Sequence, residues 1–158
     1  MYEWKWKRFE ELSLDEIYAI LRVRQEVFVI EQNCLYPDID GLDQVSWHLF
    51  AQTSNGDESV EIHAYLRVVF PGHKYIEPSI GRVLTAKDAR GQGSGRLLLE
   101  KAMELMKAEF PKQEVRISAQ KYLEAFYSGF GFAPVSEPYD EDGIPHIEMV
   151  TAIEGKAR

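Results

Sequence analysis

The residues best suited to chemistry form one glycine-rich stretch, Arg90-Gly91-Gln92-Gly93-Ser94-Gly95-Arg96. Glycine has no Cβ, so its backbone can approach a ligand closely and adopt dihedral angles that other residues avoid. The stretch stands between an expected strand (80–85) and an amphipathic helix that starts at Ser94, where backbone amides lie at the positive end of the helix dipole. Amides in that setting bind anions, best of all phosphate or pyrophosphate. Arg90 and Arg96 bracket the stretch and could add charge-assisted hydrogen bonds.

Other known motifs fit this stretch less well. A P-loop requires Gly-x-x-x-x-Gly-Lys-Ser/Thr, which the sequence lacks. A dinucleotide-binding fingerprint requires glycine or alanine where Arg96 stands. A nucleophile elbow requires one residue between its serine and each glycine, whereas Gly93 and Gly95 adjoin Ser94. A turn that only caps the helix is the remaining alternative, but a cap needs a single glycine.

Two periodicities indicate the elements that position this stretch. Alternating apolar and polar residues predict strands, and apolar residues at helical spacing predict helices. A capping box at Ser13 opens the first helix, and Pro111 ends the helix after the glycine stretch. Asn55-Gly56 is a hairpin turn signal. We expect strands at 2–9, 47–51, 62–70, 80–85, 115–119, 134–139 and 147–153, and helices at 14–28, 94–110 and 122–127. This order predicts an α/β fold, with a mixed sheet and helices on its faces.

The glycine stretch resembles the signature of the GCN5-related N-acetyltransferase (GNAT) family, Arg/Gln-x-x-Gly-x-Gly/Ala, at Arg90, Gly93 and Gly95. Downstream, Phe126-Tyr127-x-x-x-Gly131-Phe132 is similar to the Tyr-x-x-x-Gly-Phe ending of the family's last helix. Within the family the chain is most similar to the ElaA group, through three segments: 24–29 with Glu31-Gln32, 40–43 and 141–146. The resemblance implies the acyl-CoA N-acyltransferase fold, a mixed, mostly antiparallel central sheet with helices on both faces.

The resemblance also implies roles for individual residues. Backbone groups of the strand before the glycine stretch would hold the acetyl-pantetheine arm, and the amides of the stretch would bind the pyrophosphate of acetyl-CoA. Tyr127 would be the general acid that protonates the departing coenzyme A thiolate. Gln120 stands where the family often has asparagine. The implied cofactor-binding residues are Val83, Leu84, Thr85, Arg90, Gly91, Gln92, Gly93, Ser94, Gly95, Arg96 and Gln120.

The general base stays open among several residues. His146 and Glu148 lie on the expected last strand with their side chains on one face, and an imidazole titrates in the useful range. We take these two, with Tyr127, as the catalytic candidates. The other possible bases are Glu31, His48 and Glu77, and a bound water could relay the proton instead.

Composition limits the class of protein. The chain has 158 residues, the size of one domain, and a net charge of −8. We therefore expect a single N-acetyltransferase domain over residues 1–158. An acidic chain is a poor partner for nucleic acid or anionic membrane, and it weakly favours a cationic substrate such as an amine. The N-terminus lacks the pattern of a signal peptide and no apolar run approaches a membrane span, so we expect a cytoplasmic protein.

Metal and thiol chemistry find little support. Cys34 is the only cysteine, which excludes an intramolecular disulfide, a redox pair and a thiolate zinc site. The four histidines contain no His-x₃-His pair, so we expect no metal. Asp38, Asp40 and Asp43 lack the spacing of an EF-hand, and we interpret them as an acidic turn that lines the acceptor entrance.

The sequence thus favours an acetyl-CoA-dependent N-acetyltransferase. The acceptor would be a primary amine of a small molecule or a protein amino group, which attacks the thioester directly in a ternary complex. A non-catalytic acyl-CoA sensor is one alternative. An acyltransferase that uses a longer acyl thioester is another, because Arg22-x-Arg24-x-x-Val27-Phe28 is distantly similar to acyl-homoserine-lactone synthases. The aromatic N-terminal strand could pair with a second copy to form a homodimer.

Overall fold

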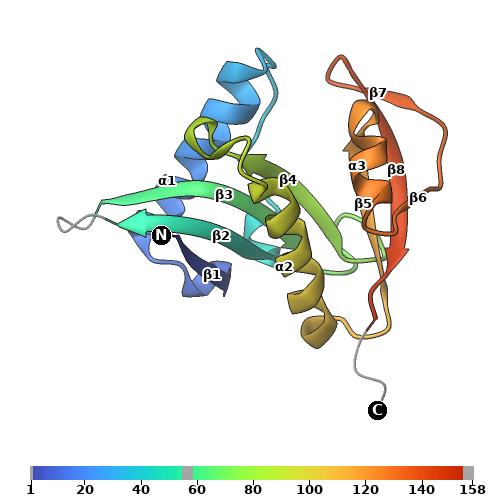
Figure 1. Ribbon diagram of the computed structural model, residues 1–158, viewed down its shortest axis with the longest axis horizontal. Coiled ribbons are helices and arrows are strands. Elements are labelled where there is room, and N and C mark those ends of the chain that lie inside the picture. Colours follow the sequence, from blue (N-terminus) through green and yellow to red (C-terminus); the bar gives the residue numbers. More distant parts are fainter. Residues whose placement is uncertain (1, 55–58, 155–158) are drawn as a thin grey trace.

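The computed structural model describes residues 2–54 and 59–154. These residues fold around one eight-stranded sheet (Figure 1). The strand order is β1-β2-β3-β4-β5-β8-β6, and β7 also pairs with β8. The expected hairpin turn at Asn55-Gly56 lies outside the described residues. The strands are β1 (Glu3–Arg8), β2 (Ser46–Ser54), β3 (Val60–Val69), β4 (Ser79–Thr85), β5 (Glu114–Gln120), β6 (Ala133–Pro134), β7 (Tyr139–Glu141) and β8 (Ile144–Ala152). The main helices are α1 (Leu14–Arg24), the π-helix η2 (Gln25–Glu31), α2 (Ser94–Glu109) and α3 (Glu124–Ser128).

Helices cover both faces of the sheet, which confirms the predicted fold class. Side chains alternate between the two faces of a strand. In β2, Leu49 therefore lies in the core that α2 covers, whereas Phe50 lies in a second core beneath α1. α2 buries an apolar stripe of Leu98, Leu99, Ala102 and Met106, and α1 buries Ile20 and Val23.

The first helix begins as the sequence predicts but changes geometry before its end. Ser13 Oγ accepts a hydrogen bond from the Glu16 amide at 3.1 Å, and the Ser13 amide donates to Glu16 Oε1 at 2.9 Å, which completes the capping box. After Arg24 the helix widens into η2, which continues to Glu31, three residues past the expected end at Phe28. Such π-helical turns occur frequently at functional sites.

The sheet has two halves that meet at a single residue pair. β1 to β4 form continuous antiparallel ladders, and β5 pairs with β8 from Glu114↔Ala152 to Gln120↔His146. β4 and β5 run parallel, but only Ser79 and Arg116 are partners. Beyond that pair the two strands diverge (Figure 1). Their backbone N–H and C=O groups therefore lack the partners that a continuous sheet would supply.

The C-terminal region corrects one prediction. The expected strand at 134–139 is wrong, because the structure has two short strands there, β6 and β7, separated by residues 135–138. Proline cannot donate to a strand ladder, and Pro134 and Pro138 flank this break. The Ser136 hydroxyl instead accepts a hydrogen bond from the Glu148 amide at 2.9 Å. The last strand, β8, also starts earlier than expected, at Ile144.

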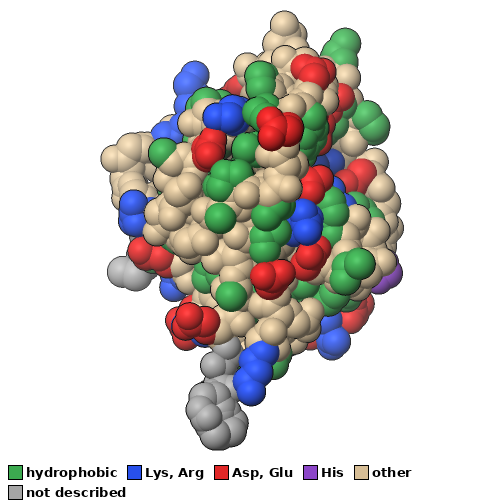
Figure 2. Space-filling model, turned by 90° about the vertical axis from the view of Figure 1, so that its right-hand side faces the viewer, with side chains coloured by type: hydrophobic (Ala, Val, Ile, Leu, Met, Phe, Trp, Pro, Cys, Tyr) green, Lys and Arg blue, Asp and Glu red, His purple; other side chains and the backbone are tan. Residues whose placement is uncertain are grey.

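The surface shows mixed charge on the face that carries the C-terminal strands. Figure 2 shows acidic and basic side chains interspersed there with hydrophobic ones. Among the described residues, no helix has both the length and the apolar character that crossing a membrane requires.

Candidate active site

A cleft of about 200 Å³ opens where β4 and β5 diverge. Its walls come from both halves of the sheet, from η2 and the segment that follows it, and from α3. It brings together three of the predicted site residues on β4, β5 and α3, Val83, Gln120 and Tyr127, and it also reaches His146 on β8. Residues that lie far apart in the sequence thus share one hollow.

A β-bulge shapes the β4 wall of the cleft. Tyr65 of β3 faces Leu84, but Arg67 faces Gly81, so Arg82 and Val83 stand opposite the single residue Leu66. Arg82 has φ +53°, a left-handed conformation that costs a residue with a Cβ about 1–2 kcal/mol. Such a conformation persists where the surroundings hold it. The bulge turns the backbone of β4 away from its regular ladder beside the cleft.

The Arg82 side chain is held by two aspartates. Its Nε donates to Asp38 Oδ1 at 2.8 Å, and its Nη2 donates to the Asp38 carbonyl at 3.0 Å and to Asp40 Oδ2 at 3.2 Å. The guanidinium also lies over the Tyr36 ring, 5.4 Å from its centre. These contacts hold the side chain of Arg82 in place, so the loop before β2 supports the left-handed backbone conformation at this point of β4.

The same aspartates belong to a buried charge network, which corrects one prediction. Arg24 Nε donates to Asp38 Oδ2 at 2.9 Å and its Nη1 donates to Asp43 Oδ1 at 2.7 Å. Arg67 Nη1 donates to Asp40 and Asp43 at 2.8 and 2.9 Å. The three aspartates therefore do not line the acceptor entrance as predicted; they neutralise three arginines beside the cleft.

The pKa of Asp40 follows from this network. Partial burial would raise the pKa of its carboxyl, but the hydrogen bonds and the positive charge of Arg67 outweigh burial and hold it well below its usual range. Asp43 is shifted in the same direction, since burial is again outweighed, here by Arg24 and then Arg67. Both carboxylates therefore stay charged at any ordinary pH.

The glycine stretch forms an open loop at the start of α2. Gly91 and Gly93 have φ of +80° and +77°, and a Cβ at either position would meet open space. The first helical hydrogen bond runs from the Leu97 amide to the Gly93 carbonyl, so the amides of Ser94 and Gly95 precede the helical ladder. Left-handed glycines beside free helix-start amides are the arrangement that binds phosphate oxygens. The loop therefore has the form of a phosphate-binding site.

The arginines around the loop take different positions. Arg90 Nε donates to the Thr85 carbonyl at 3.0 Å, and its Nη2 donates to Glu31 Oε1 at 2.6 Å. Arg90 therefore ties the loop to β4 and η2, and its charge is already paired. Arg96 is exposed and lies over the Phe130 ring at 5.5 Å, which leaves it available beside the loop.

The polar side chains of the loop support its shape. Ser94 Oγ donates to the Ala89 carbonyl at 3.3 Å, and Gln92 Nε2 donates to the Asp88 carbonyl at 3.4 Å. Both bonds turn the side chain back onto the preceding 3₁₀ turn (Lys87–Ala89), so the space in front of the loop stays clear.

Tyr127 is buried in the α3 wall of the cleft, with 6% of its surface exposed. Its ring makes edge contacts with Phe126 and Phe132. Among residues 2–54 and 59–154, no hydrogen bond to its hydroxyl is found. Burial raises the pKa of Tyr127 to about 12, so the hydroxyl keeps its proton at neutral pH.

His146 and Glu148 lie on one face of β8, as predicted, but in different settings. His146 is buried and lines the cleft; its Nδ1 is 2.8 Å from the Ile144 carbonyl and its Nε2 is 3.7 Å from Glu141 Oε2. A carbonyl can only accept, so Nδ1 is the donor of this hydrogen bond, and Nε2 is the ring nitrogen beside the Glu141 carboxylate. Glu148 instead accepts a hydrogen bond from Arg116 Nη1 at 2.8 Å.

The other candidate bases lie outside the cleft lining. Glu31 binds Arg90. Glu77 accepts hydrogen bonds from Arg116, and these bonds hold the pKa of the Glu77 carboxyl below its usual range. His48 is buried between the Tyr65 hydroxyl and the Asp43 carbonyl, at 2.7 and 2.9 Å, and burial lowers its pKa. None of these three side chains faces the space between β4 and β5.

The structure adds residues that sequence reasoning missed. Lys74, from the loop between β3 and β4, and Glu141, at the end of β7, both line the cleft. Glu141 stood in a segment similar to the ElaA group, which could have indicated it. Lys74 carried no signal, because the sequence around it shows only the turn at Pro71-Gly72.

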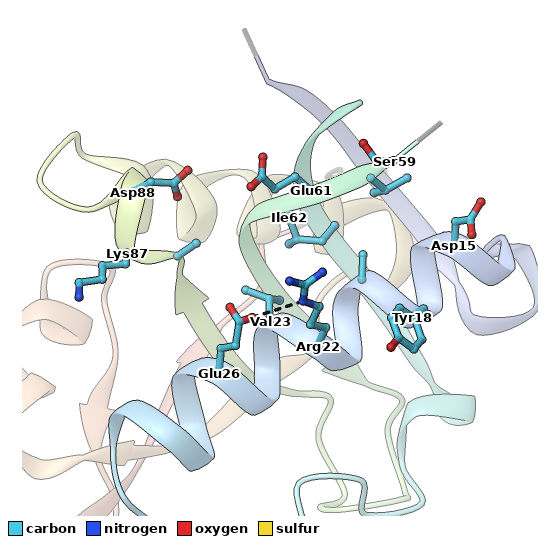
Figure 3. Close-up of a pocket in the computed structure, with 13 residues that line it drawn as sticks. Asp15, Tyr18, Arg22, Val23, Glu26, Ser59, Glu61, Ile62, Lys87 and Asp88 are labelled. Carbon is cyan, nitrogen blue, oxygen red and sulfur yellow. Dashed lines mark hydrogen bonds and ion pairs between the residues drawn. The ribbon is translucent and has the colours of Figure 1, made fainter. Parts of the chain in front are cut away.

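A larger hollow of about 550 Å³ lies elsewhere, between α1 and the start of β3. Figure 3 shows side chains from α1, β3 and the turn before the glycine loop around it. Arg22 and Glu26 pair with each other there at 3.4 Å, and none of the predicted site residues lines it. We refer to this hollow as the α1 groove.

Comparisons with known proteins agree with this geometry. The family model described as an acetyltransferase (GNAT) domain matches residues 62–153. A UPF0039 protein of Synechocystis sp. is 47% identical over 147 residues, which cover 93% of each chain. ElaA of Escherichia coli is 40% identical, over 97% of this chain and 98% of that protein. The crystal structure of an acyl-CoA N-acyltransferase from Pseudomonas aeruginosa is 41% identical with a TM-score of 0.88, over 95% of this chain and 99% of that one. With this identity across nearly its whole length, the chain belongs to the GNAT family of acyltransferases and is a relative of ElaA.

Proposed function

We propose that this chain, as a single domain, is an acetyl-CoA-dependent N-acetyltransferase that acts on a primary amine of a small molecule or protein. One observation carries the proposal: β4, which lines the cleft together with His146 and the buried Tyr127, leads through a 3₁₀ turn into a glycine loop shaped for phosphate. Acyl transfer to an amine needs a held thioester, a proton acceptor and a donor to the leaving thiolate. The cleft offers a residue for each need.

The cofactor residues act mainly through their backbone. The amides of Gly91 to Gly95 bind the diphosphate, with Arg96 as the available charged side chain and Arg90 as the residue that fixes the loop. Backbone groups of Val83, Leu84 and Thr85 bind the pantetheine arm on the side of β4 that diverges from β5, in the place that a neighbouring strand would otherwise take. An amide of the bulged segment donates to the thioester oxygen as charge develops there. Gln120, on the opposite wall, supplies an amide side chain.

Tyr127 serves the leaving group. Its hydroxyl stays protonated at neutral pH, because burial raises its pKa to about 12. A thiol has a reference pKa of about 8.5. Complete proton transfer from Tyr127 is therefore uphill, and the residue acts chiefly by donating a hydrogen bond to the departing thiolate. This gap is wider than the reference pKa values of the two groups suggest.

His146 accepts the proton of the amine. The Ile144 carbonyl accepts from Nδ1, so Nε2, 3.7 Å from Glu141 Oε2, is the nitrogen that takes the proton. Glu148 is the second candidate for this role, although its carboxylate already accepts a hydrogen bond from Arg116. His146→Gln should lower kcat at neutral pH by about 100-fold or more. Glu148→Gln serves as the matched control and should lower it by much less; the reverse order would transfer the role to Glu148.

Binding of acetyl-CoA tests the proposal directly by titration calorimetry. Gly93→Asp should weaken binding by about 100-fold, because it places a carboxylate where the diphosphate binds. Gly72→Asp is the matched control, since Gly72 is also left-handed, with φ +89° and open space around its Cβ position, but lies outside the loop. Equal affinities for the two variants, or no binding by the natural chain, would contradict the proposal.

Two further measurements address the alternatives. Thiol release with a panel of primary amines separates an enzyme from an acyl-CoA sensor, which would bind acetyl-CoA without turnover. Titration with acetyl-, butyryl- and octanoyl-CoA ranks the acyl groups. We expect acetyl-CoA to bind at least as tightly as the longer thioesters, because the cleft is small.

A further inference from the structure

Within the part of the chain that the structure describes, Lys74 is the one lysine that lines the cleft. It stands in the loop between β3 and β4, four residues after the Phe70 that follows β3. Among residues 2–54 and 59–154 its ammonium forms no ion pair and no hydrogen bond. The ammonium lies over the ring of Tyr75, 5.7 Å from the ring centre. An unpaired primary amine therefore lies at the wall of a cleft that fits an acyl donor.

The charges around Lys74 come from four different elements. Glu141 of β7 and Asp40 of the loop before β2 attract its ammonium, and Arg67 of β3 and Arg82 of β4 repel it. Lys74 is an exposed residue at the rim of the cleft, yet the protein around its ammonium lowers its pKa from the usual range, and the two arginines act in the same direction. The neutral, nucleophilic amine is therefore more populated than in an ordinary lysine.

The position of Lys74 along β4 matters as much as its charge. The glycine loop follows the C-terminal end of β4, whereas Lys74 precedes the N-terminal end. A thioester held along Val83 and Leu84 would thus have its cofactor on one side and Lys74 on the other. Lys74 lines the same cleft as Glu141 and His146, so in this arrangement it would lie on the acceptor side of the thioester.

We propose that Lys74 is a modification site, acylated by the acyl-CoA that binds in its own cleft. This inference rests on the proposed function. The neutral Lys74 nitrogen attacks the thioester carbon; a C–N bond forms, the C–S bond breaks, and coenzyme A leaves as its thiolate. The nitrogen releases one proton to His146 or water; the thiolate accepts a hydrogen bond from Tyr127 and takes its proton from water. The product is an uncharged amide at the acceptor end, so modification would oppose turnover when acceptor is scarce.

Peptide mapping by mass spectrometry tests this inference without knowledge of the acceptor. The purified chain is incubated with acetyl-CoA and no added amine, and acetylation of each lysine is followed over time. Lys74 should be acetylated at least about tenfold faster than Lys112, an exposed lysine far along the sequence that also lacks an ion pair. The Lys74 rate should level off at lower pH than that of a fully exposed lysine.

Three controls make the result decisive. Acetyl phosphate supplies acetyl groups without binding as coenzyme A does, so the preference for Lys74 should disappear. Tyr127→Phe should slow acetylation at Lys74 and leave Lys112 unchanged. Dilution of the protein should not alter the fraction modified per minute, because the reaction occurs within one molecule. Equal rates at the two lysines, a preference that persists with acetyl phosphate, or a rate that falls with dilution would each overturn the proposal.

Acetyl-CoA affinity, measured on the same preparation, separates the two levels of inference. If acetyl-CoA does not bind, the proposed function fails and Lys74 acylation fails with it. If acetyl-CoA binds and amines are turned over while Lys74 stays unmodified, only the present inference fails. As a further control, Lys74→Arg should bind acetyl-CoA normally, and its peptide that contains position 74 should carry no acetyl group.

Discussion

The cleft and the α1 groove differ in what the fold leaves unpaired. The groove is larger, about 550 Å³ against 200 Å³, yet its charged side chains include Arg22 and Glu26, which pair with each other, and Asp88, which lies 3.3 Å from His63. The cleft instead exposes two strands that meet only at Ser79 and Arg116. Volume alone would indicate the groove as the binding site, whereas the unpaired edges of β4 and β5 indicate the cleft.

The physical reason is the cost of unsatisfied polar groups. A buried backbone N–H or C=O without a partner costs about 1–3 kcal/mol. A fold that leaves several such groups along β4 and β5 is stabilised by a ligand that supplies the missing partners. The groove lies between α1 and the start of β3, a strand that pairs with β2 along its length apart from one register shift. Matched substitutions in the two hollows therefore test this difference.

The largest expected effect comes from filling each hollow with the same ring system. Val83→Trp places an indole in the cleft and should weaken acetyl-CoA binding at least about 1,000-fold, roughly 4 kcal/mol. Ala19→Trp places one in the α1 groove and should leave the affinity within about twofold. Titration calorimetry measures both. If Ala19→Trp were the variant that lost binding, the α1 groove would be the cofactor site.

Tyrosine hydroxyls in the two hollows give the next contrast. Tyr127→Phe should reduce kcat about 100-fold with little change in acetyl-CoA affinity, because the hydroxyl acts on the leaving thiolate. Tyr18→Phe, in the α1 groove, should change neither. Since the Tyr127 hydroxyl is protonated below pH about 12, its ionisation should cause no loss of wild-type activity up to pH 10. An alkaline decline that vanishes in Tyr127→Phe would contradict this assignment.

Arginines give a smaller contrast, this time in stability. Arg82→Met removes hydrogen bonds to Asp38 and Asp40 and should lower the free energy of unfolding by about 2 kcal/mol. It should also weaken acetyl-CoA binding, because the left-handed residue in β4 loses its support. Arg22→Met removes only an exposed pair in the α1 groove and should cost less than about 0.5 kcal/mol. Urea denaturation provides both values; similar losses would show that Arg82 is no more than a surface charge.

Local patterns in the sequence were sufficient to predict most elements of the fold. The capping box at Ser13 and the stop at Pro111 mark helix ends through backbone chemistry that acts within a few residues. The prediction for residues 134–139 was wrong because the structure of this region depends on pairing with β8, which lies 7 residues from Tyr139 and 15 from Pro134. The widening of the helix after Arg24 likewise had no signal in the helical repeat, which does not distinguish α from π geometry.

The candidate site likewise contains residues that local sequence motifs predicted and residues that only the fold brings together. The glycine loop and Tyr127 lie in contiguous motifs, so the sequence indicated them. Lys74 reaches the cleft only because β4 folds next to β5, and no local pattern records that. The acidic turn was misinterpreted because its partners, Arg24, Arg67 and Arg82, come from three separate elements, and only the fold brings them together.

The smallest expected effect concerns pH and the aspartates beside the cleft. The pKa of Asp40 is lowered in the folded chain, so its carboxylate contributes stability above the pKa of an unfolded aspartate, near 4, and this contribution is lost as pH falls below that value. Asp40→Asn should be less stable than the natural chain by about 1 kcal/mol at pH 7, and the difference should shrink between pH 4 and 2. Asp88→Asn, an exposed aspartate of the α1 groove, should change the unfolding free energy by less than about 0.5 kcal/mol. Urea denaturation across this pH range measures both, and a difference for Asp40→Asn that stayed constant down to pH 2 would mean that its charge is not what stabilises the wall of the cleft.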